Sequence, residues 1–168
     1  MTDGTGHGSG EPGHTRPGGP EGGRPTVTVV VPVYDDVDRL RLCLRALAGQ
    51  DYPAHLLDVV VVDNASPRDQ TAALPPDDAR FRLLHETRRG SYAARNTGVA
   101  AARGDVLAFT DADCVPRPDW VSTAVDRWGG AADRAVGGDI RLVFRDGTGP
   151  VSGPELYEVE HDFLQRTY

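Results

Sequence analysis

The sequence predicts an α/β fold in which a mostly parallel sheet is covered by helices on both faces. Short apolar runs rich in valine alternate along the chain with stretches of helical periodicity. These apolar runs are continuous, which is typical of strands that are buried on both faces of a parallel sheet. Polar residues follow directly after three of the runs. Because ligands bind at the carboxyl ends of parallel strands, the same pattern predicts one edge of the sheet as the functional site.

The individual elements follow from local signals along the chain. Asp36 is a typical N-cap residue, and apolar residues recur at helical spacing after it until Gly49 ends the pattern. An alanine-rich stretch predicts a second long helix, which Gly104 is expected to end, and Asp119 is expected to cap a third. The predicted strands are residues 27–31, 58–62, 81–85 and 105–109, with a weaker candidate at 135–144. The predicted helices are residues 37–47, a short one that starts at 66–67, 91–103, one after Asp119, and 155–168.

The first 25 residues differ from the rest of the chain in composition. Nine of them are glycine and four are proline, and they offer almost no apolar side chains for burial. Such a segment cannot offset the entropy that is lost on ordering, so we expect residues 1–25 to be a disordered tail. The remaining residues, 26–168, are predicted to form one domain.

The sequence shows no targeting or membrane signal. Residues 1–26 have no apolar core of the kind that a signal peptide contains. The longest apolar stretch, 27–33, is far shorter than the roughly 20 residues that span a bilayer. The two cysteines, Cys43 and Cys114, have no metal-type spacing. The chain is therefore expected to be cytoplasmic, with peripheral attachment to a membrane left open.

The charge composition excludes several classes of function. The chain has 25 acidic and 18 basic residues, a net charge of −7, and all of the basic residues are arginine. An acidic chain without a basic run argues against nucleic acid as a partner. The lack of lysine excludes a Walker A loop, a pyridoxal Schiff base and a protein kinase, each of which needs one.

Asp111-Ala112-Asp113 is the clearest candidate for a metal site. The two carboxylates stand two residues apart, directly after a predicted buried strand. Carboxylate oxygens suit Mg²⁺ or Mn²⁺, which commonly take their remaining ligands from the oxygens of a diphosphate. The alternative is a plain acidic turn that precedes the next helix.

Polar and aromatic residues also follow the first two strands. Asp63 and Asn64 could bind a pyrimidine edge or a ribose hydroxyl, or could form an Asx turn. Tyr34 could stack on a base, or could be a half-buried aromatic residue. Arg95, together with the basic turn at 88–90 before its helix, suits an anionic phosphate, with a solvated basic turn as the alternative.

Taken together, these motifs resemble the family 2 glycosyltransferases, which have the nucleotide-diphospho-sugar transferase (A-type) fold, a Rossmann-like α/β fold. The resemblance covers roughly residues 27–145, and it depends on five short motifs in a fixed order rather than on any one of them. The motifs are Val29–Asp35, Val60–Ser66, Ala94–Gly98, Gly104–Asp113 and Pro118–Trp120.

The resemblance implies roles for the residues around the donor nucleotide. Pro32 and Tyr34 would line the base pocket, with Tyr34 against the ring. Asp63 and Asn64 would hold the base and the ribose. Arg95 lies in the family's helix beside this pocket. The implied partners are a nucleotide diphosphate-sugar donor and an acceptor that could be a glycan, a lipid-linked molecule or a small molecule.

The resemblance also implies a metal-assisted reaction. Asp113 would be the main protein ligand of Mn²⁺ or Mg²⁺, and Asp111 would lie near the ribose and the metal. The sugar would move to an acceptor hydroxyl with inversion. An inverting step needs a general base, which in this family follows well after the Asp-x-Asp motif. We therefore expect the base beyond Tyr168 and the chain to be a donor-binding part of an enzyme.

Two departures keep alternatives open. The second acidic residue of the family's pair is here Asn64, which weakens the choice of uridine and leaves thymidine and guanosine open. Without its general base, the chain could be a non-catalytic module that binds nucleotide sugars. A sugar nucleotidyltransferase has the same fold, but its phosphate loop is glycine-rich and basic, whereas residues 34–38 are acidic and contain no glycine.

Overall fold

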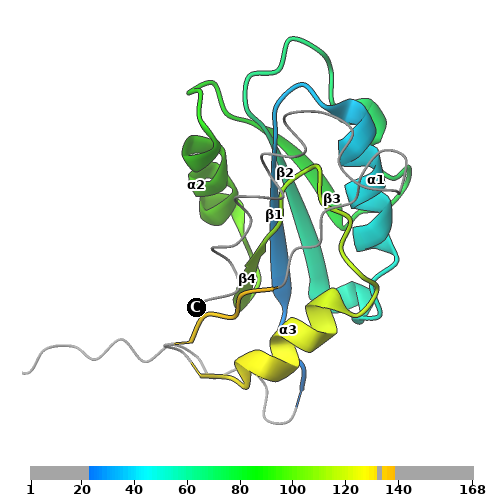
Figure 1. Ribbon diagram of the computed structural model, residues 1–168, viewed down its shortest axis with the longest axis vertical. Coiled ribbons are helices and arrows are strands. Elements are labelled where there is room, and N and C mark those ends of the chain that lie inside the picture. The colour runs from blue at the N-terminus through cyan, green and yellow to red at the C-terminus, as the bar shows by residue number, and fades with distance from the viewer. Residues whose placement is uncertain (1–22, 132–133, 139–168) are drawn as a thin grey trace, which may run out of the picture. The chain divides into compact units, whose positions relative to one another are not determined.

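The computed structural model describes residues 23–131 and 134–138 of the chain. Between Val27 and Phe109 the chain forms a four-stranded parallel sheet with strand order β3-β2-β1-β4 (Figure 1). The strands are β1 (Val27–Val33), β2 (Leu57–Asp63), β3 (Phe81–His85) and β4 (Val106–Phe109). The prediction of an α/β fold with a parallel sheet is confirmed, and each observed strand begins and ends within two residues of its predicted bounds.

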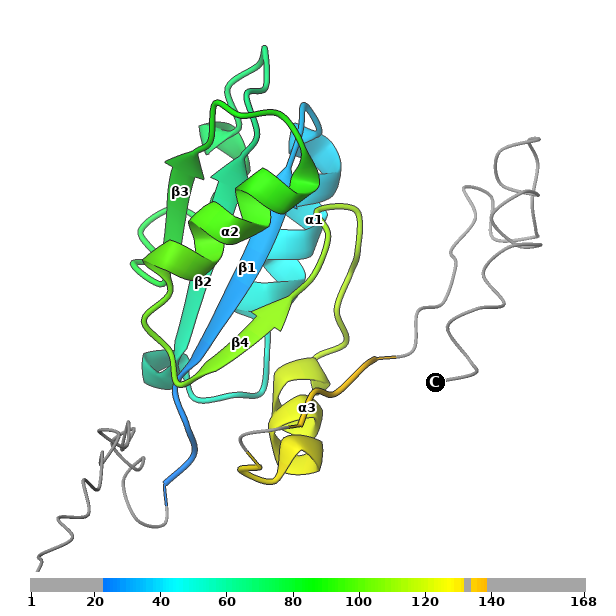
Figure 2. The ribbon, with the colours of Figure 1, turned by 90° about the vertical axis from the view of Figure 1, so that its left-hand side faces the viewer.

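Helices cover both faces of this sheet. Helix α1 (Val37–Ala48) lies on one face and helix α2 (Ser91–Ala101) on the other (Figure 2). Helix α1 is capped as predicted, because the Asp36 side chain accepts a hydrogen bond from Arg39 N at 3.1 Å and Gly49 follows the last turn. Its apolar stripe is fully buried and consists of Leu40, Cys43, Leu44 and Leu47.

Two short 3-10 helices, Ala54–Leu56 and Thr71–Ala73, connect the longer elements. The short helix that was expected to start at 66–67 begins later, at Thr71, and is a 3-10 helix. Ala65 has a left-handed φ of 60°, so the chain does not continue from β2 directly into a right-handed helix. The chain instead turns at Ser66, whose N–H donates to Asp63 Oδ1 at 3.1 Å.

A second compact unit begins at Asp119 and contains helix α3 (Trp120–Trp128). Asp119 is the N-cap residue as predicted, but its side chain makes no capping hydrogen bond, and its carbonyl accepts from Thr123 N at 3.0 Å. Residues 135–138, at the start of the weaker strand candidate, have no regular secondary structure. The rest of that candidate and the helix predicted at 155–168 lie outside the described residues.

Strand β1 lies at the centre of the core and contacts α2 very closely. The side chains of Val29, Val30 and Val31 are completely buried. An ideal Cβ placed at Gly98 of α2 would lie 2.3 Å from Val30 Cγ1, so only glycine lets the helix approach the strand this closely. The backbone of α2 at Gly98 therefore packs directly against the side chain of Val30 in the middle of the sheet.

Thr28 of β1 determines where α2 ends. Its hydroxyl accepts hydrogen bonds from Arg103 N at 3.2 Å and Gly104 N at 2.9 Å. A Cβ at Gly104 would lie 2.6 Å from Thr28 N, so the chain passes β1 at backbone distance. These bonds replace a further helical turn, which explains why α2 ends at Ala101, two residues before the predicted position.

The residues just before β1 contact the folded part of the chain. The Tyr52 hydroxyl donates to the Pro25 carbonyl at 2.6 Å, and the Arg24 guanidinium lies 5.4 Å from the centroid of the Tyr52 ring. Arg24 and Pro25 are therefore held against Tyr52. Residues 1–22 of the expected tail lie outside the described residues.

A buried carboxylate holds the loop between β3 and α2. Glu86 accepts hydrogen bonds from Arg88 N at 2.8 Å, from the Arg88 guanidinium at 3.2 and 3.3 Å, and from Thr97 Oγ1 at 2.6 Å. The bonds from the Arg88 side chain, followed by the bond from Thr97, lower the pKa of Glu86 from 4.5 to about 2. The loop is thereby fixed to the middle of α2.

Replacing Gly98 with alanine tests the close packing of α2 on β1. Helix propensity alone would favour alanine, but the added Cβ overlaps Val30. We expect Gly98→Ala to lower the free energy of unfolding by about 1–3 kcal/mol in urea titrations. Gly137→Ala is the control, because a Cβ there meets no atom within 4 Å. A Gly98→Ala variant as stable as the control would contradict this packing.

The pKa of Glu86 predicts how stability depends on pH. Because the folded pKa is lowered from 4.5 to about 2, ionised Glu86 contributes stability above about pH 4.5 that is lost as the pH falls toward 2. Wild type should therefore be more stable than Glu86→Gln at pH 7, and urea unfolding should show the difference narrowing below pH 4.5. A difference that stays constant from pH 7 to pH 3 would refute the assignment.

Candidate active site

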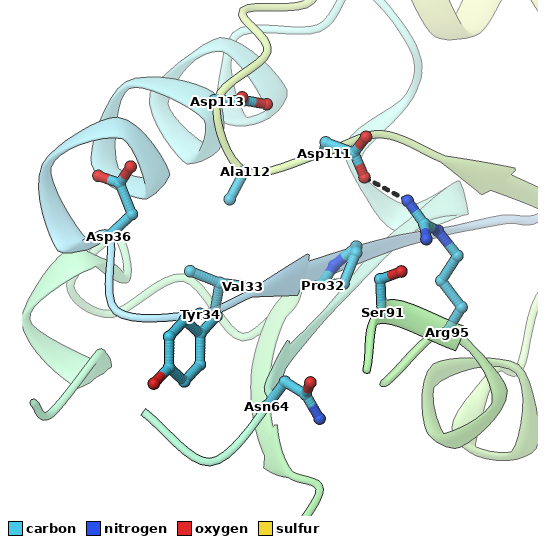
Figure 3. A pocket seen from close by; sticks show the side chains of 10 residues that line it. All are labelled: Pro32, Val33, Tyr34, Asp36, Asn64, Ser91, Arg95, Asp111, Ala112 and Asp113. Carbon is cyan, nitrogen blue, oxygen red and sulfur yellow. Dashed lines mark hydrogen bonds and ion pairs between the residues drawn. The ribbon is translucent and has the colours of Figure 1, made fainter. Parts of the chain in front are cut away.

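A pocket of about 360 Å³ lies at the carboxyl ends of β1, β2 and β4, next to the start of α2 (Figure 3). This is the edge at which the sequence predicts a site. Its walls come from segments that are far apart in the sequence and that the parallel sheet brings together. The residues that line it are Pro32, Val33, Tyr34, Asp36, Asn64, Ser91, Arg95, Asp111, Ala112 and Asp113.

Six of the seven predicted site residues line this pocket, and Asp63 is the exception. Asp36 and Ser91 also line it, although the sequence analysis treated them only as residues at helix starts. Helices α1 and α2 both begin at the edge of the sheet where the strands end. The first residues of each helix therefore lie close to the site. The position of a helix start after a predicted strand is the signal that could have identified them.

The two carboxylates of the Asp-x-Asp motif lie at the same side of the pocket (Figure 3). Asp111 Oδ1 forms an ion pair with the Arg95 guanidinium of α2. Asp113 is more than half exposed, and its Oδ2 lies 4.0 Å from Arg39 Nη1. Within the described residues, no three His, Cys, Asp or Glu side chains come close enough together to hold a metal ion by themselves.

This donor set suits a hard cation that shares its ligands with an anion. Asp111 and Asp113 offer exposed carboxylate oxygens toward one cavity, which is the ligand type that Mg²⁺ and Mn²⁺ prefer. With two protein carboxylates, such an ion keeps coordination positions for the oxygens of water or of a phosphate. The residues that are present therefore fit an ion bound jointly by the protein and its ligand.

Two thiols pack beside the Asp-x-Asp motif. The Cys43 thiol donates to the Asp111 carbonyl at 3.7 Å, and Cys114 Sγ lies 3.9 Å from Asp113 Oδ1. Burial, reinforced by Cys114 and the two carboxylates, raises the pKa of Cys43 to about 12. Burial also raises the pKa of Cys114. Both thiols therefore stay protonated at neutral pH and are packing groups rather than nucleophiles.

Asn64 lies on the floor of the pocket with its amide held in one orientation. Its Nδ2 donates to the Arg88 carbonyl at 2.7 Å and to the Glu86 carbonyl at 3.5 Å. Its Oδ1 accepts from Gly90 N at 2.7 Å, and Gly90 has a φ of 121° that only glycine adopts readily. Both amide hydrogens are used, so Asn64 can offer a ligand only the remaining lone pair of Oδ1.

Asp63 does not face the pocket. Its side chain is only 7% exposed, and Oδ1 accepts hydrogen bonds from the N–H and the hydroxyl of Ser66. Its Oδ2 lies 3.1 Å from His85 Nδ1. The carboxylate therefore organises the turn after β2, which corresponds to the turn that the sequence analysis considered as the alternative role.

The basic turn before α2 is divided between two roles. Arg88 is exposed and pairs with Glu86, so it stabilises the loop. Ser91 and Arg95, in the first turns of α2, line the pocket. Tyr34 lines it on the side of β1 and is 53% exposed. The pocket thus combines an aromatic ring, an amide acceptor, an arginine and three carboxylates, two of them from the Asp-x-Asp motif.

None of the helices in the described residues is long and apolar enough to span a bilayer.

Comparison with known proteins adds independent evidence. A family model for glycosyl transferase family 2 matches residues 28–166. Glycosyltransferase AglE of Haloferax volcanii is 36% identical over 128 residues, which cover 73% of this chain and 42% of AglE. The pre-mycofactocin glycosyltransferase of Mycobacterium tuberculosis is 32% identical over 148 residues, which cover 83% of this chain and 28% of that protein.

Two solved structures resemble the fold. The mannosyltransferase PcManGT from Pyrobaculum calidifontis, in complex with GDP-Man and Mn²⁺, has a TM-score of 0.59 and 38% identity, and covers 66% of this chain and 34% of that chain. S. aureus TarS has a TM-score of 0.55 at 24% identity, which supports the fold alone, and covers 67% of this chain and 38% of that chain. The chain therefore spans less than half the length of each of these four relatives. The family model matches most of the sequence, and the chain belongs to glycosyl transferase family 2.

Proposed function

We propose that the pocket binds a nucleotide diphosphate-sugar together with Mn²⁺ or Mg²⁺, as the donor site of an inverting glycosyltransferase. The observation that carries the proposal is the single cavity that contains Tyr34 and Asn64 as well as Asp111 and Asp113. An aromatic ring with an amide acceptor suits a nucleobase, and paired carboxylates suit a metal diphosphate. One nucleoside diphosphate contains both kinds of group.

Asp111 and Asp113 would hold the metal ion. A bound divalent cation supplies charge neutralisation for the departing nucleoside diphosphate. The protein's own part is to hold the two carboxylates at one side of the cavity and to keep Arg95 beside Asp111. Arg95 would also lie within reach of the negative charge that develops on the leaving diphosphate. The general base for the acceptor hydroxyl is assigned to none of the described residues.

Asn64 would restrict which nucleobase is accepted. Its Nδ2 hydrogens are taken by the Arg88 and Glu86 carbonyls, so it can accept a hydrogen bond from a base but cannot donate one. Uracil, thymine and guanine present a ring N–H at the edge used in pairing, whereas at that ring position adenine and cytosine have an unprotonated nitrogen and can donate only from their exocyclic amino group. The complex of PcManGT with GDP-Man makes guanosine the first of these three to test.

A thermal shift series tests the donor site and its base. We expect UDP, dTDP or GDP to raise the melting temperature in the presence of Mn²⁺, and ADP and CDP to have little effect. Saturation at about 100 times Kd should stabilise the protein by roughly 2.7 kcal/mol. Equal shifts with ADP or CDP would contradict the role of Asn64. No shift with any nucleotide, on a protein that melts cooperatively, would refute the donor site.

Replacing Asp113 with alanine tests the metal assignment. We expect Asp113→Ala to abolish the part of nucleotide binding that depends on Mn²⁺, because one of the two carboxylate ligands is lost. Asp38→Ala is the matched control, since Asp38 is a carboxylate on α1 that does not line the pocket and is 84% exposed. Calorimetric titration of each variant with and without Mn²⁺ provides the measurement. Unchanged metal dependence in Asp113→Ala would refute the assignment.

A further inference from the structure

We propose that Asp63 and Ser66 are positioning residues that hold Tyr34 in place for the donor's base. The inference rests on the proposed function, since it takes Tyr34 as the residue that contacts the base. It assigns to Asp63 a role other than contact with the nucleotide, and it brings in Ser66, which does not line the pocket.

The first step is the anchor at the end of β2. The side chain of Asp63 is only 7% exposed, so its carboxylate cannot move without disturbing the core. Its Oδ1 accepts both the N–H and the hydroxyl of Ser66. The preceding residue, Ala65, has a left-handed φ of 60°, and this unusual conformation turns Ser66 back toward Asp63. The Ser66 hydroxyl is therefore fixed by a buried group.

The second step crosses from β2 to the loop after β1. The Ser66 hydroxyl donates to Asp63 and, through its oxygen, accepts a hydrogen bond from Asp35 N at 2.8 Å. Asp35 also has a left-handed φ, 52°, which costs free energy in a residue other than glycine unless its surroundings hold it. The Asp35 N–H bond to Ser66 is one of the contacts that hold it.

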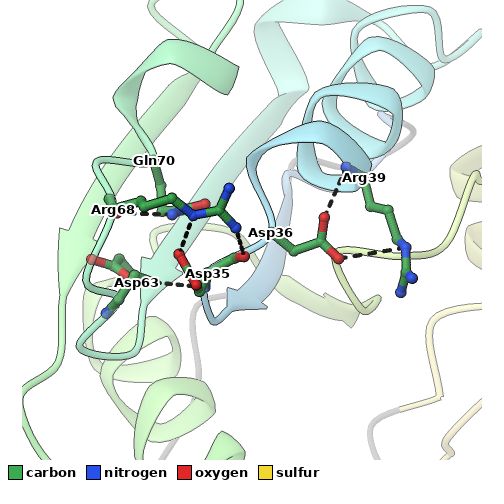
Figure 4. A network of polar contacts seen from close by, with 7 residues as sticks. Asp35, Asp36, Arg39, Asp63, Arg68 and Gln70 are labelled. Carbon is green, nitrogen blue, oxygen red and sulfur yellow. Dashed lines mark hydrogen bonds and ion pairs between the residues drawn. The ribbon is translucent and has the colours of Figure 1, made fainter.

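The third step closes the network from the surface. Arg68 Nε donates to Asp35 Oδ1 at 2.6 Å, and the Arg68 guanidinium also donates to the Asp35 carbonyl. Figure 4 shows Asp35 held between Arg68 and the turn that Asp63 organises. Asp35 is thus bound through its N–H, its carbonyl and its side chain.

Tyr34 lies between this held residue and the end of the sheet. On its other side, the Val33 carbonyl accepts from Asn64 N at 2.9 Å as the last bond of the β1–β2 ladder. With both neighbours fixed to β2 or its loop, the backbone of Tyr34 has little freedom. Its ring, 53% exposed, is therefore presented to the pocket by the two loops together rather than by packing around the ring itself.

A positioning role differs measurably from a purely structural one. Loss of overall stability would weaken every ligand alike. Misplacement of Tyr34 would weaken only ligands that contain a base, and Mn²⁺-pyrophosphate has none. We therefore compare the affinity of the full chain for a nucleoside diphosphate with its affinity for pyrophosphate, each with Mn²⁺.

Ser66→Ala is the principal variant, because it breaks the link to Asp35 while the carboxylate of Asp63 keeps its bond from the residue 66 N–H. Tyr34→Ala should weaken nucleoside diphosphate binding about tenfold, the loss expected for one base stacking contact. Ser66→Ala should cause part of the same loss, leave pyrophosphate binding unchanged, and add nothing when combined with Tyr34→Ala. Ser122→Ala, which removes another hydrogen-bonded serine hydroxyl, is the matched control.

Arg68→Ala provides a second route that leaves the buried anchor intact. Arg68 is 60% exposed, so its removal should not prevent folding. It should weaken nucleoside diphosphate binding in the same way as Ser66→Ala. Its control is Arg41→Ala, which removes the exposed Arg41–Asp38 pair on α1. Equal losses of nucleotide and pyrophosphate affinity, or losses that simply add to that of Tyr34→Ala, would overturn the proposal.

Hydrogen exchange at the Asp35 amide separates this proposal from the proposed function, because it needs no ligand. Ser66→Ala should make that amide exchange faster, since it loses its acceptor. Unchanged exchange would overturn the positioning role. Faster exchange in a protein whose wild type binds no nucleoside diphosphate would support the link between the loops and overturn the donor site instead.

Discussion

The pairing of β1 with β2 on one side and with β4 on the other is the constraint on which the whole site depends. The three strands are parallel and paired from the first residue of each, with Val27 beside both Leu57 and Val106. Because the three strands run in the same direction, their carboxyl ends meet at one edge. The loops that leave this edge bring Tyr34 and Asp36 after β1, an amide after β2 and two carboxylates after β4.

Much of this arrangement could be predicted from the sequence, because buried parallel strands produce continuous apolar runs. Strand β3 was predicted with its observed bounds, and the cap of α1 at Asp36 was also correct. The end of α2 was not predicted correctly, because it depends on Thr28. This residue is about 75 positions away in the sequence, and its hydroxyl accepts hydrogen bonds from the backbone of Arg103 and Gly104. Local propensity contains no information on such a contact.

Prediction of the site is limited in the same way, because it depends on the course of the chain in three dimensions. Asp63 and Asn64 are neighbours at the end of one strand, and both were predicted to bind the nucleotide. The structure separates them: Asn64 lines the pocket, whereas Asp63 is engaged by Ser66 and His85. Adjacent residues at a strand end point in different directions, and only the course of the following turn decides which of them faces the cavity. That turn depends on the left-handed φ of Ala65, which the residue type does not suggest.

The side-chain amide of Asn64 makes three hydrogen bonds with the backbone of residues 86–90, and these bonds restrict which substitutions the pocket can accept. An aspartate at this position would have the same shape but no hydrogens to donate to the Arg88 and Glu86 carbonyls. A single exchange would therefore place a carboxylate against two carbonyl oxygens and release the loop that leads into α2. A change at position 64 would therefore call for a matching change in residues 86–90, so the floor of the pocket and this loop depend on each other.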